Sequence, residues 1–216
     1  MKTTIVTLAI GLMVIASLSA QEFHLGIKGG VNFASIGGDE TDDIDRRTAF
    51  HAGLVSEIKF TEKFAVQPEL LYSALGYKTE FSETINGVQL SEEQSVDLDY
   101  LTIPLMAKYY LMDNLAIEAG PQIGLLLSAN RESEERVNGG NINSSEKSEE
   151  DIKDSVNGTD IGFAAGLSFN TGTGAFISAR YVLGVSNIND FSESENSVDI
   201  SNQNNVIQLS IGYLFN

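Results

Sequence analysis

Polar and apolar residues alternate along most of the chain after residue 21, and this period of two is typical of β-strands with two different faces. Near the start, for example, Leu25 and Ile27 fall on one face, and Gly26 and Lys28 fall on the other. The pattern predicts eight strands and no helix. The expected strands lie near residues 22–33, 48–60, 64–79, 98–110, 115–128, 159–169, 175–185 and 205–215.

The connections between these segments differ in length in a regular way. Three are short (61–63, 111–114 and 170–174), and four are long and hydrophilic (37–48, 80–97, 129–158 and 186–204). Short and long connections alternate, so all the long loops are expected at one end. Outer-membrane barrels have this asymmetry, with short periplasmic turns and longer outer loops. The expected strands also reach the roughly 9–11 residues that cross a hydrocarbon layer when tilted.

The same alternation fits a soluble, lipocalin-like barrel, whose apolar face is inside. The polar face of this chain, however, is rich in glycine, which suits the narrow interior of an eight-stranded barrel better than a soluble exterior. The glycines concerned are Gly26, Gly30, Gly53, Gly120, Gly124, Gly162, Gly166, Gly184 and Gly212. Aromatic residues also gather near the expected strand ends, where interfacial girdles lie. These are Phe23, Phe50, Phe60, Phe64, Tyr109, Tyr110, Phe169, Tyr213 and Phe215.

Charges on the polar face balance one another, although the whole chain has a net charge of −17. In a narrow lumen such charges have to be paired. We therefore expect a structural charge network inside the barrel, with the remaining acidic charge in the long loops. Its expected members are Lys28, Lys59, Lys108 and Arg180 with Glu57, Glu69, Glu118 and Asp160.

Residues 1–20 have the features of a secretory signal peptide. Lys2 provides the positive charge, an apolar run follows from Ile5 to Ile15, and small residues precede Gln21. The apolar run is too short for a membrane-spanning helix, which needs about 20 residues. The expected organisation is thus a signal peptide over 1–20 and one barrel domain over 21–216.

Composition excludes several kinds of site. The absence of Cys excludes disulfides and thiolate metal sites, and the acidic charge argues against nucleic acid as a partner. His24 and His51 are the only histidines, and both fall on the polar face. We expect packed lumen residues there, with a relay from His51 to a serine such as Ser35 as the enzymatic alternative. No cofactor, metal or catalytic residue is predicted. Loose divalent-cation binding by the acidic run 39–45 stays open beside its interpretation as a solvated loop.

Five stretches resemble the PorT-type outer-membrane β-barrel proteins of Bacteroidota. They are residues 26–32 (GIKGGVN), 67–73 (QPELLYS), 101–105 (LTIPL), 120–121 (GP) and 212–215 (GYLF). The resemblance covers the whole chain after the signal peptide and implies an outer-membrane barrel. The founding member's association with the type IX secretion system is implied only as one option, because the shared positions specify a barrel and not a reaction.

Together these observations predict a single eight-stranded antiparallel up-and-down transmembrane barrel with four long outer loops and three short periplasmic turns. The expected function is a structural or interaction role in the cell envelope. The expected partners are outer-membrane lipid, lipopolysaccharide and other envelope proteins. A soluble barrel that binds an apolar ligand, a narrow pore and an outer-membrane enzyme are the alternatives.

Overall fold

The computed structural model describes residues 22–38, 45–85, 87–139, 142–188 and 202–215. The expected signal peptide and most of the acidic run 39–45 lie outside these residues. Within them the chain forms nine strands and one short 3-10 helix, η2 (Lys153–Ser155). The strands are β1 (Glu22–Gly38), β2 (Asp45–Lys59), β3 (Phe64–Ile85), β4 (Val88–Met112), β5 (Leu115–Gly139), β6 (Ile142–Asp151), β7 (Thr159–Asn170), β8 (Ala175–Gly184) and β9 (Asn202–Phe215).

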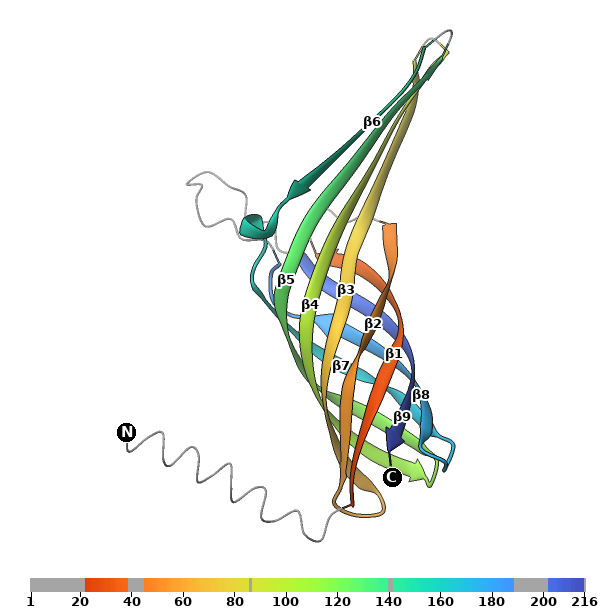
Figure 1. Ribbon diagram of the computed structural model, residues 1–216, viewed down its shortest axis with the longest axis vertical. Helices are drawn as coiled ribbons and strands as arrows, with labels where there is room; N and C mark the ends of the chain where they lie inside the picture. The colour runs from red at the N-terminus through yellow and green to blue at the C-terminus, as the bar shows by residue number, and fades with distance from the viewer. Residues whose placement is uncertain (1–21, 39–44, 86, 140–141, 189–201, 216) are drawn as a thin grey trace, which may run out of the picture.

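Eight of these nine strands close into a ring in which every pairing is antiparallel. The order is β4-β3-β2-β1-β9-β8-β7-β5, and pairing between β4 and β5 closes it. The ninth strand, β6, pairs with the far half of β5, beyond the part of β5 that pairs with β7. Figure 1 shows the ring as a tilted barrel. The expectation of an all-β, antiparallel, up-and-down barrel is confirmed. Among the described residues no helix is long and apolar enough to cross a membrane.

Short turns join the strands at one end of the barrel, where β1 also begins and β9 ends (Figure 1). They follow β2, β4 and β7, and the turn after β7 contains Gly172 and Gly174 with positive φ angles of 76° and 93°. Residues with a side chain rarely adopt such angles, so the two glycines allow the chain to reverse within four residues.

Apolar side chains of the ring point outward and polar side chains point inward. Leu54 on β2 and Ile211 on β9 are 59% and 66% exposed, whereas Lys28, Glu69 and Arg180 are buried. This arrangement is the reverse of the soluble barrel considered above, which would keep its apolar face inside. Tyr110 is a correction to the sequence analysis: it was expected in an outer aromatic girdle but is buried in the lumen.

Glycine on the inward face has a direct steric reason at Gly30. A Cβ atom there would collide with the backbone carbonyl oxygen of Leu209 on β9 and would lie 2.9 Å from Cε1 of His51 on β2. Real Cβ atoms essentially never come this close to a neighbouring heavy atom. Glycine therefore lets β1 approach β9 and leaves space for the imidazole.

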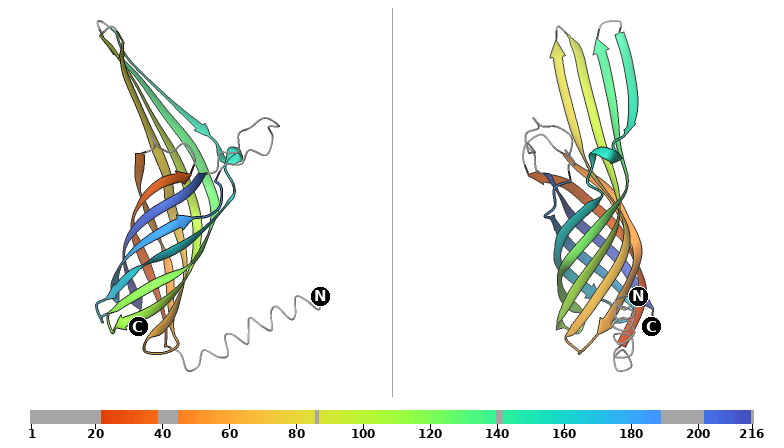
Figure 2. Two further views of the ribbon diagram at one scale, coloured as in Figure 1. Left: turned by 180° about the vertical axis from the view of Figure 1, so that it is seen from behind. Right: turned by 90° about the vertical axis from the view of Figure 1, so that its left-hand side faces the viewer.

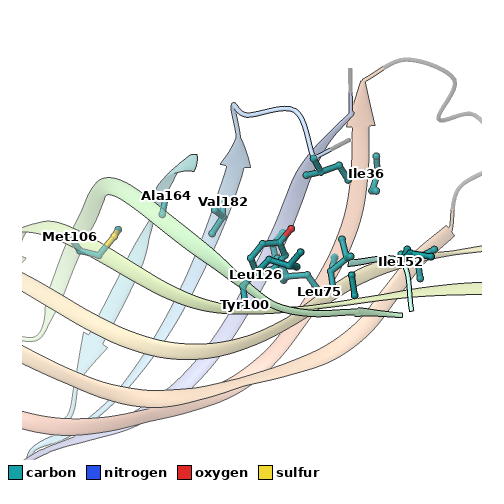
Figure 3. Close-up of a cluster of buried hydrophobic side chains, with 14 residues drawn as sticks. Ile36, Leu75, Tyr100, Met106, Leu126, Ile152, Ala164 and Val182 are labelled. Carbon is teal, nitrogen blue, oxygen red and sulfur yellow. The ribbon is translucent and has the colours of Figure 1, made fainter. Parts of the chain in front are cut away.

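A cluster of buried apolar residues fills the lumen at the end opposite the short turns (Figure 3). Tyr100 on β4 is fully buried in it, and Leu75, Leu98 and Leu126 are also buried. The cluster lies where β3, β4 and β5 leave the ring, so side chains of these strands close the barrel at this end.

For two of the four long loops expected from the sequence the prediction is wrong, because these segments form regular secondary structure. Residues 80–97 belong to a continuous hairpin of β3 and β4, and most of 129–158 belongs to β5, β6 and η2. These segments form a four-stranded sheet, in the order β3-β4-β5-β6, that rises beyond the rest of the barrel (Figures 1 and 2). We call this sheet the extension and define it as residues 77–85, 88–98, 129–139 and 142–151.

The extension forms despite a composition rich in Ser, Asn and Glu, which have low β-propensity. The reason is that β3, β4 and β5 enter it already paired within the ring. The register of β3 with β4 continues unchanged, and β4 and β5 stay paired beyond one register shift between Asp99 and Tyr100. Lys78 on β3 and Glu93 on β4 also form a cross-strand ion pair of 3.1 Å. Backbone pairing inherited from the barrel thus outweighs local propensity.

Candidate functional site

The barrel lumen holds most of the charged residues that the sequence predicted there, and Glu69 on β3 lies at its centre. Lys28 Nζ on β1 donates to Glu69 Oε2 at 3.2 Å. Arg180 on β8 donates through Nη1 and Nη2 to the two carboxylate oxygens of Glu69, at 2.9 and 2.6 Å. Arg180 Nε also bonds to Glu118 on β5. One arginine thus joins two carboxylates across the lumen.

A second group surrounds Glu57 on β2, nearer the short turns. Lys108 Nζ and the hydroxyl of Tyr110 each donate to Glu57 Oε2 at 2.8 Å. Lys59 is 3.9 Å from the same carboxylate, and about a third of its side chain is exposed. Gln67 links the two groups, because its Oε1 accepts from Lys108 at 3.0 Å and its Nε2 donates to Glu69 at 2.6 Å.

Asp160 does not belong to this network, which corrects the sequence prediction. It lies at the start of β7, far from the short turns, and its partner is the hydroxyl of Ser186 at 3.0 Å. Among the described residues no lysine or arginine forms an ion pair with it. The sequence placed Asp160 on the inward face, where it is buried, but gave no information on its height along the barrel.

A buried polar chain around His51 was missed by the sequence analysis. His51 Nδ1 lies 2.8 Å from Asn32 Oδ1, and His51 Nε2 lies 2.8 Å from the hydroxyl of Ser210. Asn32 Nδ2 donates to the hydroxyl of Ser73 at 2.9 Å. The inward position of all four in the alternation was the available signal, but their meeting depends on the register of β1 with β2 and β9.

Ser210, His51 and Asn32 are hydrogen-bonded in the order of a Ser-His-Asn relay, in which a histidine activates a serine for acyl transfer. The sequence analysis named Ser35 as a possible serine of this relay. In the structure Ser35 Oγ instead donates to the Asn205 carbonyl oxygen at 3.3 Å, and Ser210 is the serine that contacts His51. His51 is 1% exposed and Asn32 is 0% exposed. The histidine and the asparagine of the relay are therefore packed inside the lumen.

The other histidine, His24, lies at the end of the barrel that carries the short turns. It lines a cavity of about 540 Å³ together with Glu57, Lys59 and Asn170. Within the part of the chain that the structure describes, no three His, Asp or Glu residues are grouped so as to hold a metal ion. The lumen therefore combines paired charges near the turns, a neutral polar chain around His51 and the apolar cluster of Figure 3 beyond it.

Comparisons with solved structures give barrels of distant sequence. The attachment invasion locus protein Ail of Yersinia pestis is 14% identical, with a TM-score of 0.44, over 90% of this chain and 99% of that chain. Neisserial surface protein A is 8% identical, with a TM-score of 0.42, over 88% and 97%. OprG of Pseudomonas aeruginosa is 11% identical, with a TM-score of 0.37, over 90% and 97%.

No curated protein matches the chain. The family comparison, in contrast, covers most of it: residues 19–190 match the family described as "Outer membrane protein beta-barrel domain". This range includes the strands from β1 to β8 and every residue of the lumen charge network. The chain is therefore a member of the outer membrane protein beta-barrel domain family and an outer-membrane protein.

Proposed function

We propose that this protein is a closed outer-membrane barrel with a structural or interaction role, whose task is to hold the extension on the outer side of the membrane. The single observation that carries this proposal is that three ring strands, β3, β4 and β5, continue without interruption into the extension. A rigid connection of this kind transmits the fixed position of the barrel to the exposed sheet. The short turns then face the periplasm, as in other outer-membrane barrels.

The proposal includes the lipid surroundings. The exposed apolar side chains of the ring would contact the hydrocarbon layer, and exposed aromatic residues near the short turns, such as Phe60, Phe64 and Tyr213, would lie at the interface. The outer leaflet would supply lipopolysaccharide around the base of the extension. Residues 1–20 would act as the cleaved signal peptide.

The lumen charge network has a structural role in this proposal. Its buried cations each contact a carboxylate, and the apolar cluster of Figure 3 closes the lumen beyond it. A small barrel filled in this way leaves no continuous water path, so we expect no conductance. Stable single-channel steps in a planar bilayer would contradict this part of the proposal.

The experiment that tests the placement uses the absence of cysteine from the natural chain. Ser145→Cys lies on β6 of the extension, and Thr173→Cys lies in the turn between β7 and β8; both positions are exposed. A membrane-impermeant maleimide applied to intact cells should label the Ser145→Cys variant and leave the Thr173→Cys variant unlabelled until the cells are broken. Both variants should migrate differently on SDS gels with and without boiling, as a folded barrel does.

The opposite labelling pattern, or a protein recovered without detergent, would refute the placement. A role as an accessory of a secretion system, as the PorT-type resemblance implies, belongs to the same proposal. Crosslinking from the thiol of the Ser145→Cys variant in intact outer membranes tests it, because an accessory should yield a specific adduct with another envelope protein.

A further inference from the structure

The two faces of the extension differ, although both are exposed to solvent. Residues that lie directly opposite one another on adjacent strands share a face, so the register defines each face. We call the inner face the one that continues the lumen-facing row of β4 through Leu98 and Val96. Its further members towards the tip include Phe81, Ile85, Leu90, Glu92, Glu135 and Glu146. At its base, opposite Val96, lies Arg131, which pairs with Glu150 at 3.5 Å.

Apolar side chains gather on the inner face near the tip. Phe81, Ile85 and Leu90 are 58%, 48% and 38% exposed, and Leu90 lies directly opposite Val137 on β5. The outer face at the same height is polar throughout, with Glu80, Ser82, Thr84, Gln89 and Ser91. Apolar side chains that are exposed on just one of the two faces of a sheet indicate a contact surface on that face.

At the height of Phe81, three glutamates form a row across the other strands of the inner face. Glu92 on β4 lies opposite Glu135 on β5, which lies opposite Glu146 on β6. In the described part of the chain none of the three takes part in an ion pair. Like charges directly opposite one another destabilise a sheet, so this row weakens the extension while nothing is bound.

The outer face also has glutamates, and lysine and arginine neutralise only some of them. Among the described residues Glu80, Glu132 and Glu149 form no ion pair, and Glu132 lies directly opposite Glu149. Lys78 pairs with Glu93, and both Arg136 and Lys147 pair with Glu134, at 2.7 to 3.1 Å. Unpaired glutamates therefore occur on both faces of the extension, but among the described residues only those of the inner face lie beside exposed apolar side chains.

We propose that the inner face of the extension docks an extended, cationic segment of a partner protein that also carries apolar side chains. The inference rests on the proposed function, because it requires the extension to be outside the membrane. Strands rise about 3.3 Å per residue, so same-face positions two residues apart are separated by about 7 Å. The three glutamates lie on neighbouring strands, which are about 4.8 Å apart. A partner segment that crosses the inner face diagonally, with apolar side chains followed by lysines or arginines at alternate positions, would therefore reach first the Leu90 region and then the glutamates.

Charge selects this occupant over the alternatives. The segments 39–44 and 189–201, which lie outside the described residues, contain acidic residues and no lysine or arginine. A second copy of the chain presents the same glutamates, and lipopolysaccharide is anionic. Each of these would add negative charge to an uncompensated row, whereas a cationic segment would remove the repulsion.

The test uses the full barrel in lipid nanodiscs and a fluorescent peptide with Leu, Leu, Lys, Lys and Lys at successive alternate positions, separated by Thr. The inner-face variant Glu92→Gln/Glu135→Gln/Glu146→Gln is compared with the outer-face variant Glu80→Gln/Glu132→Gln/Glu149→Gln. All six glutamates are exposed, and both variants remove three charges. We expect the inner variant to weaken binding by at least about tenfold and the outer variant by less than about twofold.

Phe81→Ser/Leu90→Ser should also weaken binding by about tenfold, and a peptide with Glu in place of Lys should not bind. Equal losses in the two triple variants would overturn the proposal, because they would reduce the effect to net charge. Absence of binding to the natural protein would overturn it as well. Failure of the proposed function can be told apart from failure of this docking proposal. If the proposed function is wrong, the Ser145→Cys variant stays unlabelled on intact cells, whatever the binding experiment in nanodiscs shows.

Discussion

Arg180 on β8 and Glu69 on β3 form a two-bond contact across the lumen, at 2.6 and 2.9 Å, between strands that are not neighbours in the ring. Arg180 also bonds to Glu118 on β5, and Lys28 on β1 bonds to Glu69. Backbone pairing fixes only adjacent strands, so side-chain contacts of this kind, together with the apolar cluster, connect opposite walls of the barrel. A planar guanidinium suits this position because it contacts two carboxylates at once.

Replacing Arg180 by methionine should destabilise the barrel strongly. The variant leaves Glu69 with Lys28 as its remaining cation and Glu118 without one, and an uncompensated buried charge costs roughly 3–5 kcal/mol. Urea unfolding in lipid vesicles measures this loss. The exposed turn variant Lys63→Met is the control and should unfold like the natural protein.

The double variant Arg180→Met/Glu118→Met separates charge burial from loss of packing. It removes the unpaired carboxylate together with the arginine, so it should regain part of the stability that Arg180→Met loses. A double variant that is less stable than Arg180→Met would show that packing, rather than an uncompensated charge, causes the loss.

Tyr110→Phe should cost about 1.5–3 kcal/mol, because the lost hydroxyl donates to the buried carboxylate of Glu57. The adjacent residue gives a matched control: Tyr109 faces outward and is 45% exposed. Tyr109→Phe should therefore have little effect on unfolding in the same vesicles. Equal effects of the two substitutions would contradict the inward position of Tyr110.

Gly30→Ala should impair folding, since the added methyl group meets the Leu209 carbonyl oxygen and the ring of His51. Gly29→Ala serves as the comparison, because a Cβ there would find its nearest neighbour, the His51 carbonyl oxygen, at an ordinary 3.5 Å. The fraction of heat-modifiable protein recovered from vesicles distinguishes the two. Equal yields would mean that β1 does not need glycine at position 30.

The sequence predicted the faces of the ring strands well, because alternation reports directly which side chains lie together on a strand. It did not predict where inward residues lie along the barrel, since height depends on register and tilt. Asp160 and Glu118 both point into the lumen, but they lie at different heights along the barrel axis, and of the two only Glu118 forms a hydrogen bond with Arg180. Register likewise determines that Ser210, and not Ser35, reaches His51.

The extension was missed for another reason. Ser, Asn and Glu between residues 80 and 97 indicate a loop when propensity is considered alone. Phe81 and Ile85 fall on one face of this segment, but Glu83 stands between them on the same face. A solvated sheet thus lacks the continuous apolar face by which strands are recognised. Pairing carried over from β3 and β4 in the ring supplies the stability that this segment lacks by itself.

The outer face of the extension should lose stability in acid, and Glu134 on β5 is the titrating group. Hydrogen bonds from Arg136 and Lys147 lower the pKa of Glu134 from its ordinary 4.5 to about 2. Because the pKa is lower in the folded state, the ionised carboxylate contributes its full stabilisation above about pH 4.5. This contribution is lost as the pH falls from there towards 2. The protection factors of the β5 and β6 amides, which compare each exchange rate with the intrinsic rate at the same pH, should therefore fall between these values.

The variant Arg136→Gln/Lys147→Gln gives the reference for this prediction. Without its two cations Glu134 should titrate near its ordinary pKa, so the pH dependence of the protection factors between 4.5 and 2 should largely disappear. At neutral pH the variant should exchange faster than the natural protein, because the stabilising contacts are already missing. Identical exchange profiles for the two proteins would exclude Glu134 as the group that ties β5 to β6.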